Sequence, residues 1–484
     1  MAIAPLRKDA NDSNGANESW TPDWVQDAVF YQVFPERFSN GNARNDPPGT
    51  ESWGGRPTRT SFFGGDLDGV IQKLDYLEDL GVTALYLTPV FTAPSNHKYD
   101  TEDYLAVDPG FGGTASLKTL VEALHRRGMR ILLDGVFNHV GSQFWAFRDV
   151  VANGAGSRYR DWFIIDSFPI RQTPRPNYRA CGGAPFLPKL NMDNPEVRQY
   201  LFSVAEHWVK TAGIDGWRLD VPWEVPHEFW REFRSRMKGL RPDLYLVGEF
   251  WGDAAPWLEG DQFDGAMNYP LRELALRFFT QRAIDAGTFA RELARLRAAY
   301  PRQANSAMLN LLGCHDTQRL LTACRGREDV AIQALAFIFT YPGAPHVYYG
   351  DENGMTGGND PGCRAPMVWE ETRWRRSIRQ AVTTLVRLRR EHVALRRGGF
   401  RIVLATERVI AFHRDASEFA GPGNVALVVA NAGFQRESVR IPLRDAGQAL
   451  GHCRDHFGGR EVNVLNGELQ LTLEAQETAI LLPD

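Results

Sequence analysis

Short runs of β-branched and aromatic residues alternate along the chain with segments whose apolar residues recur every three to four positions. The first cycle, which begins near Asp27, has a strand pattern at residues 28–34, a helical pattern at 70–77 and a second strand pattern at 82–87. This alternation is typical of a parallel sheet whose strands are joined by crossover helices. Because eight such strands close a (β/α)8 barrel, we predict an α/β fold of the TIM barrel type. The other six strand patterns lie at residues 129–133, 214–219, 244–247, 263–267, 308–312 and 347–349.

The alternation fails in two parts of the chain. The segment 138–195 is rich in Gly, Pro and aromatic residues and has no helical face, which predicts an inserted domain B after strand 3. From about Phe400 the pattern changes to short strands separated by turn residues, which predicts a C-terminal antiparallel β-sandwich. The predicted division is therefore a polar N-terminal tail at 1–23, a catalytic barrel at 24–137 and 196–398, domain B at 138–195, and the β-sandwich at 399–484.

Composition narrows the classes of function. Lys and Arg number 55 and Asp and Glu number 59, a net charge of −4, so no excess of basic residues favours nucleic acid or an anionic membrane. A neutral substrate fits this balance better. The five cysteines are scattered and match no CxxC pattern, so we expect reduced thiols. The first twenty residues have no apolar signal core, and Pro342 and Pro345 interrupt the most apolar stretch, so we expect a cytoplasmic protein without a membrane segment.

Charged residues gather where the predicted strands end. Reacting groups of a TIM barrel stand at the C-terminal ends of its strands, so we expect these side chains to converge on one mouth. No dinucleotide-binding, P-loop or zinc-binding sequence motif competes with this site. The residues concerned are Asp134, Asn138 and His139 after strand 3, Arg218 and Asp220 at strand 4, Glu249 at strand 5, and His315 and Asp316 after strand 7.

Two of these carboxyl groups suit glycoside hydrolysis. Arg218 and Asp220 are two positions apart on a strand, so they point to the same side, and the guanidinium should keep Asp220 ionised as a nucleophile. Glu249 lies in an apolar setting near other acids, which should raise its pKa and make it the proton donor. A separation of about 5–5.5 Å between the two would imply a covalent intermediate and retention of configuration. Asp316 remains to bind sugar hydroxyls in the transition state.

Each of these residues also has an ordinary structural interpretation. A single Asp at a strand end is more often a helix N-cap or a turn former, and an Arg two residues from an Asp is commonly an ion pair. Aromatic residues of the loops, among them Trp53 and Trp251, are mostly core residues, although sugar rings do stack on such faces. The coincidence of several acids at barrel-compatible positions favours catalysis over these separate interpretations.

The ordered motifs resemble those of the α-amylase family of glycoside hydrolases: DGVFNH at 134–139, GWRLDVPWE at 216–224, GEFW at 248–251 and LLGCHD at 311–316. LPKLN at 187–191 resembles the marker of the neopullulanase, cyclomaltodextrinase and maltogenic amylase branch. The resemblance implies Asp220 as nucleophile, Glu249 as acid/base and Asp316 as transition-state stabiliser. The substrate contacts that it implies are Tyr99, His139, Arg218, Trp223, Glu224, Trp251, His315, Asp360 and Arg364.

The same branch often holds a structural calcium ion in the loop after the first strand, and no organic cofactor is implied. The corresponding ligands here are Asn40, Asn42, Asn45, Asp46, Gly64 and Asp66. Oxygen ligands of this kind suit a hard cation. Asn42 stands where the resemblance leads us to expect an Asp, so calcium binding should be weakened. The alternative is an Asn/Asp/Gly-rich turn without an ion.

The resemblance leads to a retaining α-glucoside hydrolase that cleaves α-1,4 bonds, with α-1,6 bonds as an extension, in maltodextrins, cyclodextrins, starch or pullulan. Two departures matter. The barrel pattern begins by Asp27, which leaves no room for the N-terminal β domain common in the branch, so we expect a monomer rather than a domain-swapped dimer. Trp223 replaces a small amide beside the acceptor subsites. The alternatives are a transglycosylase, an exo-acting α-glucosidase, or a non-catalytic carbohydrate-binding protein.

Overall fold

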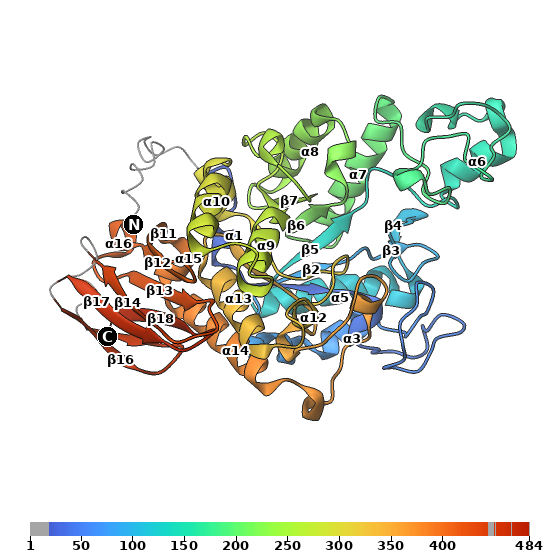
Figure 1. Cartoon of the computed structure of the whole chain (residues 1–484). Coiled ribbons are helices and arrows are strands. Elements are labelled where there is room, and N and C mark those ends of the chain that lie inside the picture. Colours follow the sequence, from blue (N-terminus) through green and yellow to red (C-terminus); the bar gives the residue numbers. More distant parts are fainter. Residues whose placement is uncertain (1–18, 444–449, 451, 466, 484) are drawn as a thin grey trace.

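A closed barrel of eight parallel strands forms the centre of the protein (Figure 1). The structure, a computed structural model, describes residues 19–443, 450, 452–465 and 467–483. Most of the predicted tail at 1–23 lies outside these residues. The strand order around the barrel is β1-β10-β9-β8-β7-β6-β5-β2, which confirms the predicted (β/α)8 fold. The barrel strands are β1 (Phe30–Val33), β2 (Ala84–Leu87), β5 (Arg130–Gly135), β6 (Gly216–Leu219), β7 (Tyr245–Phe250), β8 (Gly265–Asn268), β9 (Leu309–Leu311) and β10 (Ala344–Tyr348).

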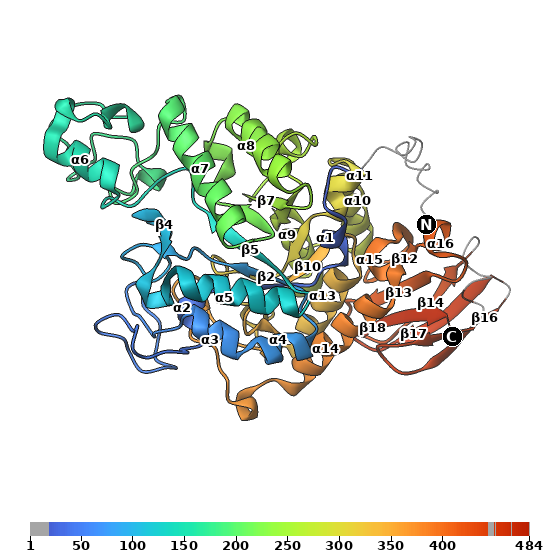
Figure 2. The ribbon, with the colours of Figure 1, turned by 180° about the vertical axis from the view of Figure 1, so that it is seen from behind.

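Helices surround the barrel, as Figures 1 and 2 show from opposite sides. In α5 the apolar face that the sequence pattern predicts is the one that packs inward: Leu117, Leu120, Val121 and Leu124 are buried. The helices are α1 (Asp23–Asp27), α2 (Pro35–Phe38), α3 (Leu67–Gln72), α4 (Leu74–Leu80), α5 (Gly113–Arg126), α7 (Pro195–Thr211), α8 (His227–Leu240), α9 (Tyr269–Ala275), α10 (Ala286–Ala298), α11 (Arg302–Ser306), α12 (Leu320–Ala323), α13 (Glu328–Thr340), α14 (Arg376–Glu391) and α15 (Val393–Arg397).

Side chains that point inward from alternate positions of the strands fill the barrel interior. Every second residue of a strand points inward, and Phe30, Leu132, Val247 and Leu309 belong to the apolar cluster in the lumen. The segment 330–349, whose prolines predicted an interruption, divides into helix α13 and strand β10. The lumen is therefore a packed core, and the polar residues that follow the strands are left for the barrel mouth.

The segment between β5 and α7 projects from the barrel at its upper edge in Figure 1. Isolated bridges, such as the one between His139 and Lys189, hold it together in place of a sheet. The expectation that this segment has no helical face was wrong: helix α6 (Trp145–Asn153) buries Phe147 and Val150. The helix is only nine residues long, and the surrounding Gly- and Pro-rich sequence obscured its period. A two-stranded sheet of β3 (Phe91–Thr92) and β4 (Asp103–Val107) follows β2.

The C-terminal part is a single antiparallel sheet of eight strands in the order β11-β12-β13-β18-β15-β16-β17-β14. Its first and last strands, β11 and β14, lie against each other, so the sheet closes over a core of its own that includes Leu427, Leu471 and Leu481. The predicted antiparallel sandwich is confirmed as this one folded sheet. Its elements are β11 (Gly399–Ala405), β12 (Val409–Asp415), α16 (Ser417–Ala420), β13 (Val425–Asn431), β14 (Glu437–Pro442), β15 (His452–Asp455), β16 (Glu461–Leu465), β17 (Glu468–Leu473) and β18 (Thr478–Pro483).

Among the residues that the structure describes, no helix combines the length and the apolar character needed to span a bilayer.

Candidate active site

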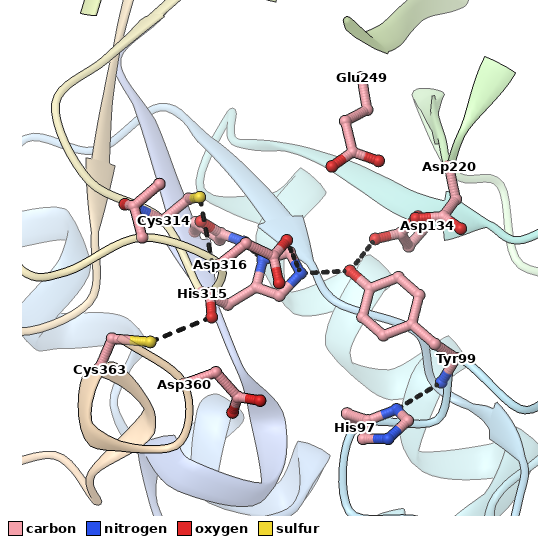
Figure 3. Close-up of polar contacts among 12 residues, drawn as sticks. His97, Tyr99, Asp134, Asp220, Glu249, Cys314, His315, Asp316, Asp360 and Cys363 are labelled. Atoms are coloured by element: carbon pink, nitrogen blue, oxygen red, sulfur yellow. Dashed lines mark hydrogen bonds and ion pairs between the residues drawn. The ribbon is translucent and has the colours of Figure 1, made fainter. Parts of the chain in front are cut away.

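The polar residues predicted at the strand ends meet at the C-terminal mouth of the barrel. Arg218 is part of β6, and Asp220 is the first residue after this strand. Glu249 is part of β7, the neighbouring strand. Asp316 lies in the loop after β9. Figure 3 shows the side chains of Asp220, Glu249 and Asp316 directed toward a common space. Parallel pairing therefore brings together three acids that are far apart in sequence.

A single guanidinium holds the central acids. Nη1 of Arg218 donates to Oδ1 of Asp220 at 2.9 Å and to Oδ1 of Asp134 at 2.8 Å. Nη2 lies 2.9 Å from Oε2 of Glu249. Arg218 is fully buried, and Asp220 and Glu249 are only 6% and 5% exposed. Because both carboxyl groups bind one rigid, planar cation, the geometry fixes them relative to each other.

The electrostatics differ from the sequence-based expectation. Burial and the negative charge of Glu249 raise the pKa of Asp220 well above its usual range, and Arg218 opposes them only in part. The predicted influence of Arg218, which lowers the pKa of Asp220, is present, but burial and Glu249 outweigh it. One guanidinium faces three carboxyl groups, so Arg218 offsets only part of the cost of an ionised Asp220 in this buried setting.

Arg218 is held in place by Asp134, which is itself bound by two tyrosines. The sequence did not predict this role for Asp134. Oδ2 of Asp134 accepts hydrogen bonds from the hydroxyl groups of Tyr86 at 2.6 Å and Tyr99 at 2.8 Å. Tyr86 projects inward from β2 and Asp134 projects inward from β5. Strand β5 pairs with β2 on one side and with β6 on the other. The alternation of β5, with Leu132 and Asp134 on the same side, was the available signal for this placement.

A second cluster surrounds Asp316. Nε2 of His315 lies 2.9 Å from Oδ2 of Asp316, and Nη2 of Arg364 donates to its Oδ1 at 2.8 Å. Although burial opposes them, these two neighbours hold the pKa of Asp316 below its usual range. Nη1 of Arg364 also lies 3.3 Å from Oδ1 of Asp360. The predicted residues His315, Asp316, Asp360 and Arg364 are thus one connected group.

Gln32, which the sequence reasoning did not single out, sets the orientation of His315. Its Nε2 lies 2.7 Å from Nδ1 of His315, inside the barrel. An amide nitrogen can only donate a hydrogen bond, so Nδ1 of His315 accepts it. The proton of a neutral His315 therefore resides on Nε2. The Nε2 proton then faces Asp316 and the hydroxyl of Tyr99, whose ring stacks on His315 at 5.4 Å between centroids.

Two residues of domain B contact Glu224 at the barrel mouth. Nζ of Lys189 and Nδ2 of Asn138 both bind Oε2 of Glu224, at 3.0 and 3.3 Å. His139 lies close by, and its Nε2 donates to the carbonyl oxygen of Tyr99 at 3.2 Å. Burial lowers the pKa of His139 to about 4, so its ring is neutral near pH 7. Trp223, next to Glu224, leaves 42% of its surface exposed.

Trp251 forms an aromatic wall beside Glu249. Its Nε1 donates to Oε1 of Glu249 at 3.0 Å. Its ring stacks on Tyr269 with 3.9 Å between centroids, and the residue is 47% exposed. The indole therefore orients the carboxyl group and leaves part of its own surface accessible to a sugar ring.

The loop predicted to bind calcium is organised around Asp66. Its carboxylate accepts hydrogen bonds from the backbone of Gly41, Asn42 and Gly69 and from Nδ2 of Asn45. Asn45 keeps its Oδ1 buried without a hydrogen-bond partner. A buried amide oxygen without a partner is costly unless something binds it, so the donor set fits a cation there. The other predicted ligands lie in the same loop: Nδ2 of Asn40 donates to Oδ1 of Asp46, and Gly64 lies against both.

One further group brings metal-ligating atoms together, among the residues that the structure describes. Atoms of Cys314, His315 and Asp316 lie within 4.8 Å of one another. His315 and Asp316 are already engaged by Gln32, Tyr99 and Arg364. A resident metal does not fit there, because it would have to displace these bonds.

Comparisons with known proteins agree with this architecture. Residues 32–387 match the family described as "Alpha amylase, catalytic domain". The chain is 48% identical to a cyclomaltodextrinase of Geobacillus thermopakistaniensis over 96% of its length and 76% of that protein. It is 49% identical to neopullulanase 2 of Thermoactinomyces vulgaris, over 95% of its length and 78% of that protein. Among solved structures, it is similar to the cyclic α-maltosyl-(1→6)-maltose hydrolase of Arthrobacter globiformis, with a TM-score of 0.87, 42% identity, and coverage of 95% of this chain and 99% of that one.

Proposed function

Because the chain belongs to the α-amylase family of glycoside hydrolases, we propose that it hydrolyses α-1,4-glucosidic bonds of maltodextrins and cyclodextrins with retention of configuration. The observation that carries this proposal is the shared guanidinium of Arg218, 2.9 Å from both Asp220 and Glu249. Retaining hydrolysis needs one carboxyl group as nucleophile and a second as proton donor on either side of one anomeric carbon. Two buried carboxyl groups fixed on one cation meet that requirement.

In the first half of the reaction, Glu249 donates its proton to the glycosidic oxygen and the carboxylate of Asp220 attacks C1. The C1–O bond breaks, the leaving sugar departs as an alcohol, and an ester joins C1 to Asp220. In the second half, Glu249 removes a proton from water, whose oxygen attacks C1 and releases Asp220 as a carboxylate. Two inversions at C1 give net retention.

The electrostatics of the pair support these roles. Burial, and after it the negative charge of Glu249, raises the pKa of Asp220 well above its usual range. Asp220 must nevertheless attack as an anion, so the reaction needs the proton on Glu249 when the glycosidic oxygen approaches. Arg218 contacts Asp220 through Nη1, which favours the ionised form of the nucleophile at that moment.

The remaining side chains supply binding. Asp316, ionised and held by His315 and Arg364, is suited to bind the hydroxyl groups of the sugar as its ring flattens toward the oxocarbenium ion. Tyr99 offers a ring face at the same sugar. Asp360 and Arg364 form a clamp on the donor side. On the acceptor side we assign Trp223, Glu224 and Trp251, and the neutral His139 completes the pocket as a hydrogen-bonding group.

We extend the substrate range to α-1,6 bonds of pullulan and to cyclic α-maltosyl-(1→6)-maltose. Support comes from the relatives named neopullulanase 2 and cyclic α-maltosyl-(1→6)-maltose hydrolase. The second of these is covered over 99% of its length, so that cyclic tetrasaccharide should be assayed beside β-cyclodextrin, pullulan and soluble starch. The relative rates on these four substrates rank the candidates directly.

Replacing Asp220 with Asn tests the mechanism. The amide cannot form the ester intermediate, so turnover of maltotriose should fall to background while the melting temperature stays within a few degrees of wild type. Proton NMR of the wild-type reaction should detect the α-anomer as the first product formed. Substantial turnover by Asp220→Asn, or initial release of the β-anomer, would refute the assignment.

Transglycosylation and exo-acting hydrolysis use the same carboxyl groups and differ only in the acceptor and in the cleaved position. The product profile from maltoheptaose distinguishes them: products longer than the substrate indicate transfer, and stepwise release of glucose indicates exo action.

We also propose a monomer in a reducing compartment. The described residues contain no disulfide, which supports the compartment. Light scattering of the purified protein tests the oligomeric state.

A structural calcium ion in the loop after β1 is part of the proposal. Asn45 and Asp46 would supply side-chain oxygens and Gly64 a backbone carbonyl, with Asn40, Asn42 and Asp66 shaping the loop. The ion would cross-link the loop and take no part in proton transfer. Calorimetric titration of the chelated protein should give binding heat with Ca²⁺ that Asn45→Ala removes. Absence of heat in the wild-type protein would leave hydrogen bonds to Asp66 as the sole organiser of the loop.

A further inference from the structure

A cavity of about 500 Å³ lies between the long loop after α2 and the loop after β10. Both loops follow barrel strands on the face that carries the proposed active site. The volume falls in the range of small-molecule sites, roughly 300–1,000 Å³. The groups of its lining that matter here are the side chains of Ser39, Asp46, Glu51, Ser52, Trp53 and Trp369.

The two tryptophans of this cavity differ in what they can offer a ligand. The ring of Trp369 is already occupied: Nζ of Lys73 lies 4.3 Å from its centroid, and Tyr76 packs edge-on at 5.0 Å. Trp53 is fixed by one hydrogen bond from its Nε1 to the carbonyl oxygen of Met367 at 2.9 Å. No aromatic or cationic side chain stacks on Trp53 among the described residues. Trp53 is half-buried and packs against the hydrophobic core, so it is anchored while part of its indole lines the cavity.

Hydrogen-bonding groups without partners surround this indole. Glu51 is exposed, and its carboxylate makes no hydrogen bond or ion pair within the described part of the chain. Ser52 lies next to it in sequence, and its hydroxyl likewise has no partner there. Elsewhere in the loop such groups are satisfied; Thr50, for example, donates to the carbonyl oxygen of Pro47 at 2.7 Å. Acceptors beside an open indole are the usual elements of a site for a polyhydroxylated ring.

We propose that this cavity is a second glucan-binding site, which takes one or two glucosyl units of a maltodextrin by stacking on Trp53 and accepting hydroxyl protons at Glu51. The inference rests on the proposed function for the class of ligand. The same loop reaches the proposed donor clamp, because Nε of Arg59 lies 3.5 Å from Oδ2 of Asp360. A long glucan that leaves the clamp therefore has a second anchor on the loop that it already touches.

A cation is the other ligand that Glu51 and Asp46 could attract. The indole favours the sugar, because a sugar ring stacks on an aromatic face and a metal ion gains nothing from one. The test below separates the two ligands.

Binding is measured on the full chain in the Asp220→Asn background, which preserves the sugar. Calorimetric titration with maltotriose should fit two classes of site. Adding Trp53→Ala should weaken the second class about tenfold, equivalent to ~1.4 kcal/mol, and leave the first unchanged. Trp53→Phe, which keeps a ring, should retain most of the affinity. Glu51→Gln leaves the bond to Met367 intact and should weaken the second class as well, whereas Glu418→Gln, on the exposed helix α16, should have no effect.

Kinetics separate this proposal from the proposed function. In the otherwise wild-type chain, Trp53→Ala should raise KM for soluble starch severalfold and leave kcat/KM for maltotriose unchanged. A single class of maltotriose sites that neither Trp53→Ala nor Glu51→Gln alters would overturn the cavity proposal while leaving the catalytic one intact. Binding of CaCl2 that is lost in Glu51→Gln, with no effect on sugar binding, would also overturn it. Failure of Asp220→Asn to abolish turnover would count against the mechanism and not against the cavity.

Discussion

Two regions of the molecule that bury arginines compensate their charge in opposite ways. At the barrel mouth, Arg218 lies against the carboxyl groups of Asp134, Asp220 and Glu249, so acids outnumber the cation. At the junction between barrel and C-terminal sheet, Arg389 and Arg414 are equally buried but bind backbone carbonyls instead of acids. The first region concentrates charge, and the second disperses it over peptide dipoles.

The pKa values follow this difference. The acids around Arg218 raise its pKa well above the usual range, in spite of burial. At the junction, burial lowers the pKa of Arg389 to about 9 and that of Arg414 well below its usual range. The carbonyls concerned belong largely to helix ends, including Phe339 and Thr340 of α13, which lack partners within their helix. A helix C-terminus also attracts a cation through its dipole. The junction arginines therefore hold elements together, whereas Arg218 holds acids in reactive positions.

The largest effect that we predict from this comparison is at Arg218. Arg218→Lys retains the charge but loses the planar fork, which holds Asp220 through Nη1 and Glu249 through Nη2 in a fixed geometry. We expect kcat/KM for maltotriose to fall about a thousandfold, with a smaller change in melting temperature. Steady-state kinetics and thermal unfolding measure the two effects. A variant with activity within tenfold of wild type would show that the fork is not needed.

At the junction the effects should be reversed. Arg414→Met removes hydrogen bonds to Thr340, Leu395 and Gly398 and leaves the carbonyls of Thr340 and Gly398 buried without a partner, whereas Leu395 keeps its bond from Arg389. Each orphaned group costs about 1–3 kcal/mol, so unfolding should become easier by ~3 kcal/mol or more. We expect a melting temperature several degrees lower and an unchanged kcat/KM at 25 °C. Arg126→Met, at an exposed position on α5, is the matched control and should alter neither quantity. Loss of activity without loss of stability would contradict the assigned division of roles.

The sequence was sufficient for the features that depend on local period and strand order. Eight apolar runs separated by helical patterns predicted the barrel, and the position of Asp220 two residues after Arg218 predicted their contact. Glu249 joined them because parallel strands end at one edge of the barrel. What the sequence could not provide was proximity between inward-facing residues. Gln32 and His315 are 283 positions apart, and the cavity at Trp53 exists only where two loops meet.

Burial was the other missing quantity. The chain order indicated that Arg218 would stabilise the charge of Asp220, and that contact exists. It did not indicate that both would be almost fully enclosed beside Glu249, which reverses the net direction of the pKa shift. Helix α6 was missed for a related reason. Its apolar side chains are buried within domain B, and the helix is too short to show a long amphipathic period in the sequence.

Acid sensitivity should originate at the mouth. His139 has a pKa of about 4 in the folded protein, lowered by burial, against about 6.5 when unfolded. The unfolded state therefore binds the proton first, and the stability present above pH 6.5 is lost as the pH falls toward 4. Between pH 7 and 5 this group should account for ~2 kcal/mol of lost stability. Urea unfolding of His139→Gln at the two pH values should show a smaller decrease than wild type, and an unchanged decrease would refute the attribution.

The smallest effect that we predict concerns Gln32, a positioning residue that acts through His315. Its amide at 2.7 Å from Nδ1 selects the tautomer that carries its proton on Nε2, toward Asp316. Gln32→Leu removes that selection, and we expect kcat/KM to fall about tenfold, or ~1.4 kcal/mol of transition-state stabilisation.

A merely structural role for Gln32 would lower the melting temperature and leave the pH profile of kcat/KM in place. Gln32→Glu separates the two possibilities, because a carboxylate at this position accepts a hydrogen bond from the protonated Nδ1 and so favours the charged imidazole. The imidazolium then persists to higher pH, so the pH profile of kcat/KM should shift in Gln32→Glu and stay in place in Gln32→Leu. Identical profiles in both variants and the wild type would mean that Gln32 packs the barrel and does not govern His315. In that case, Asp316 and Tyr99 would orient the ring.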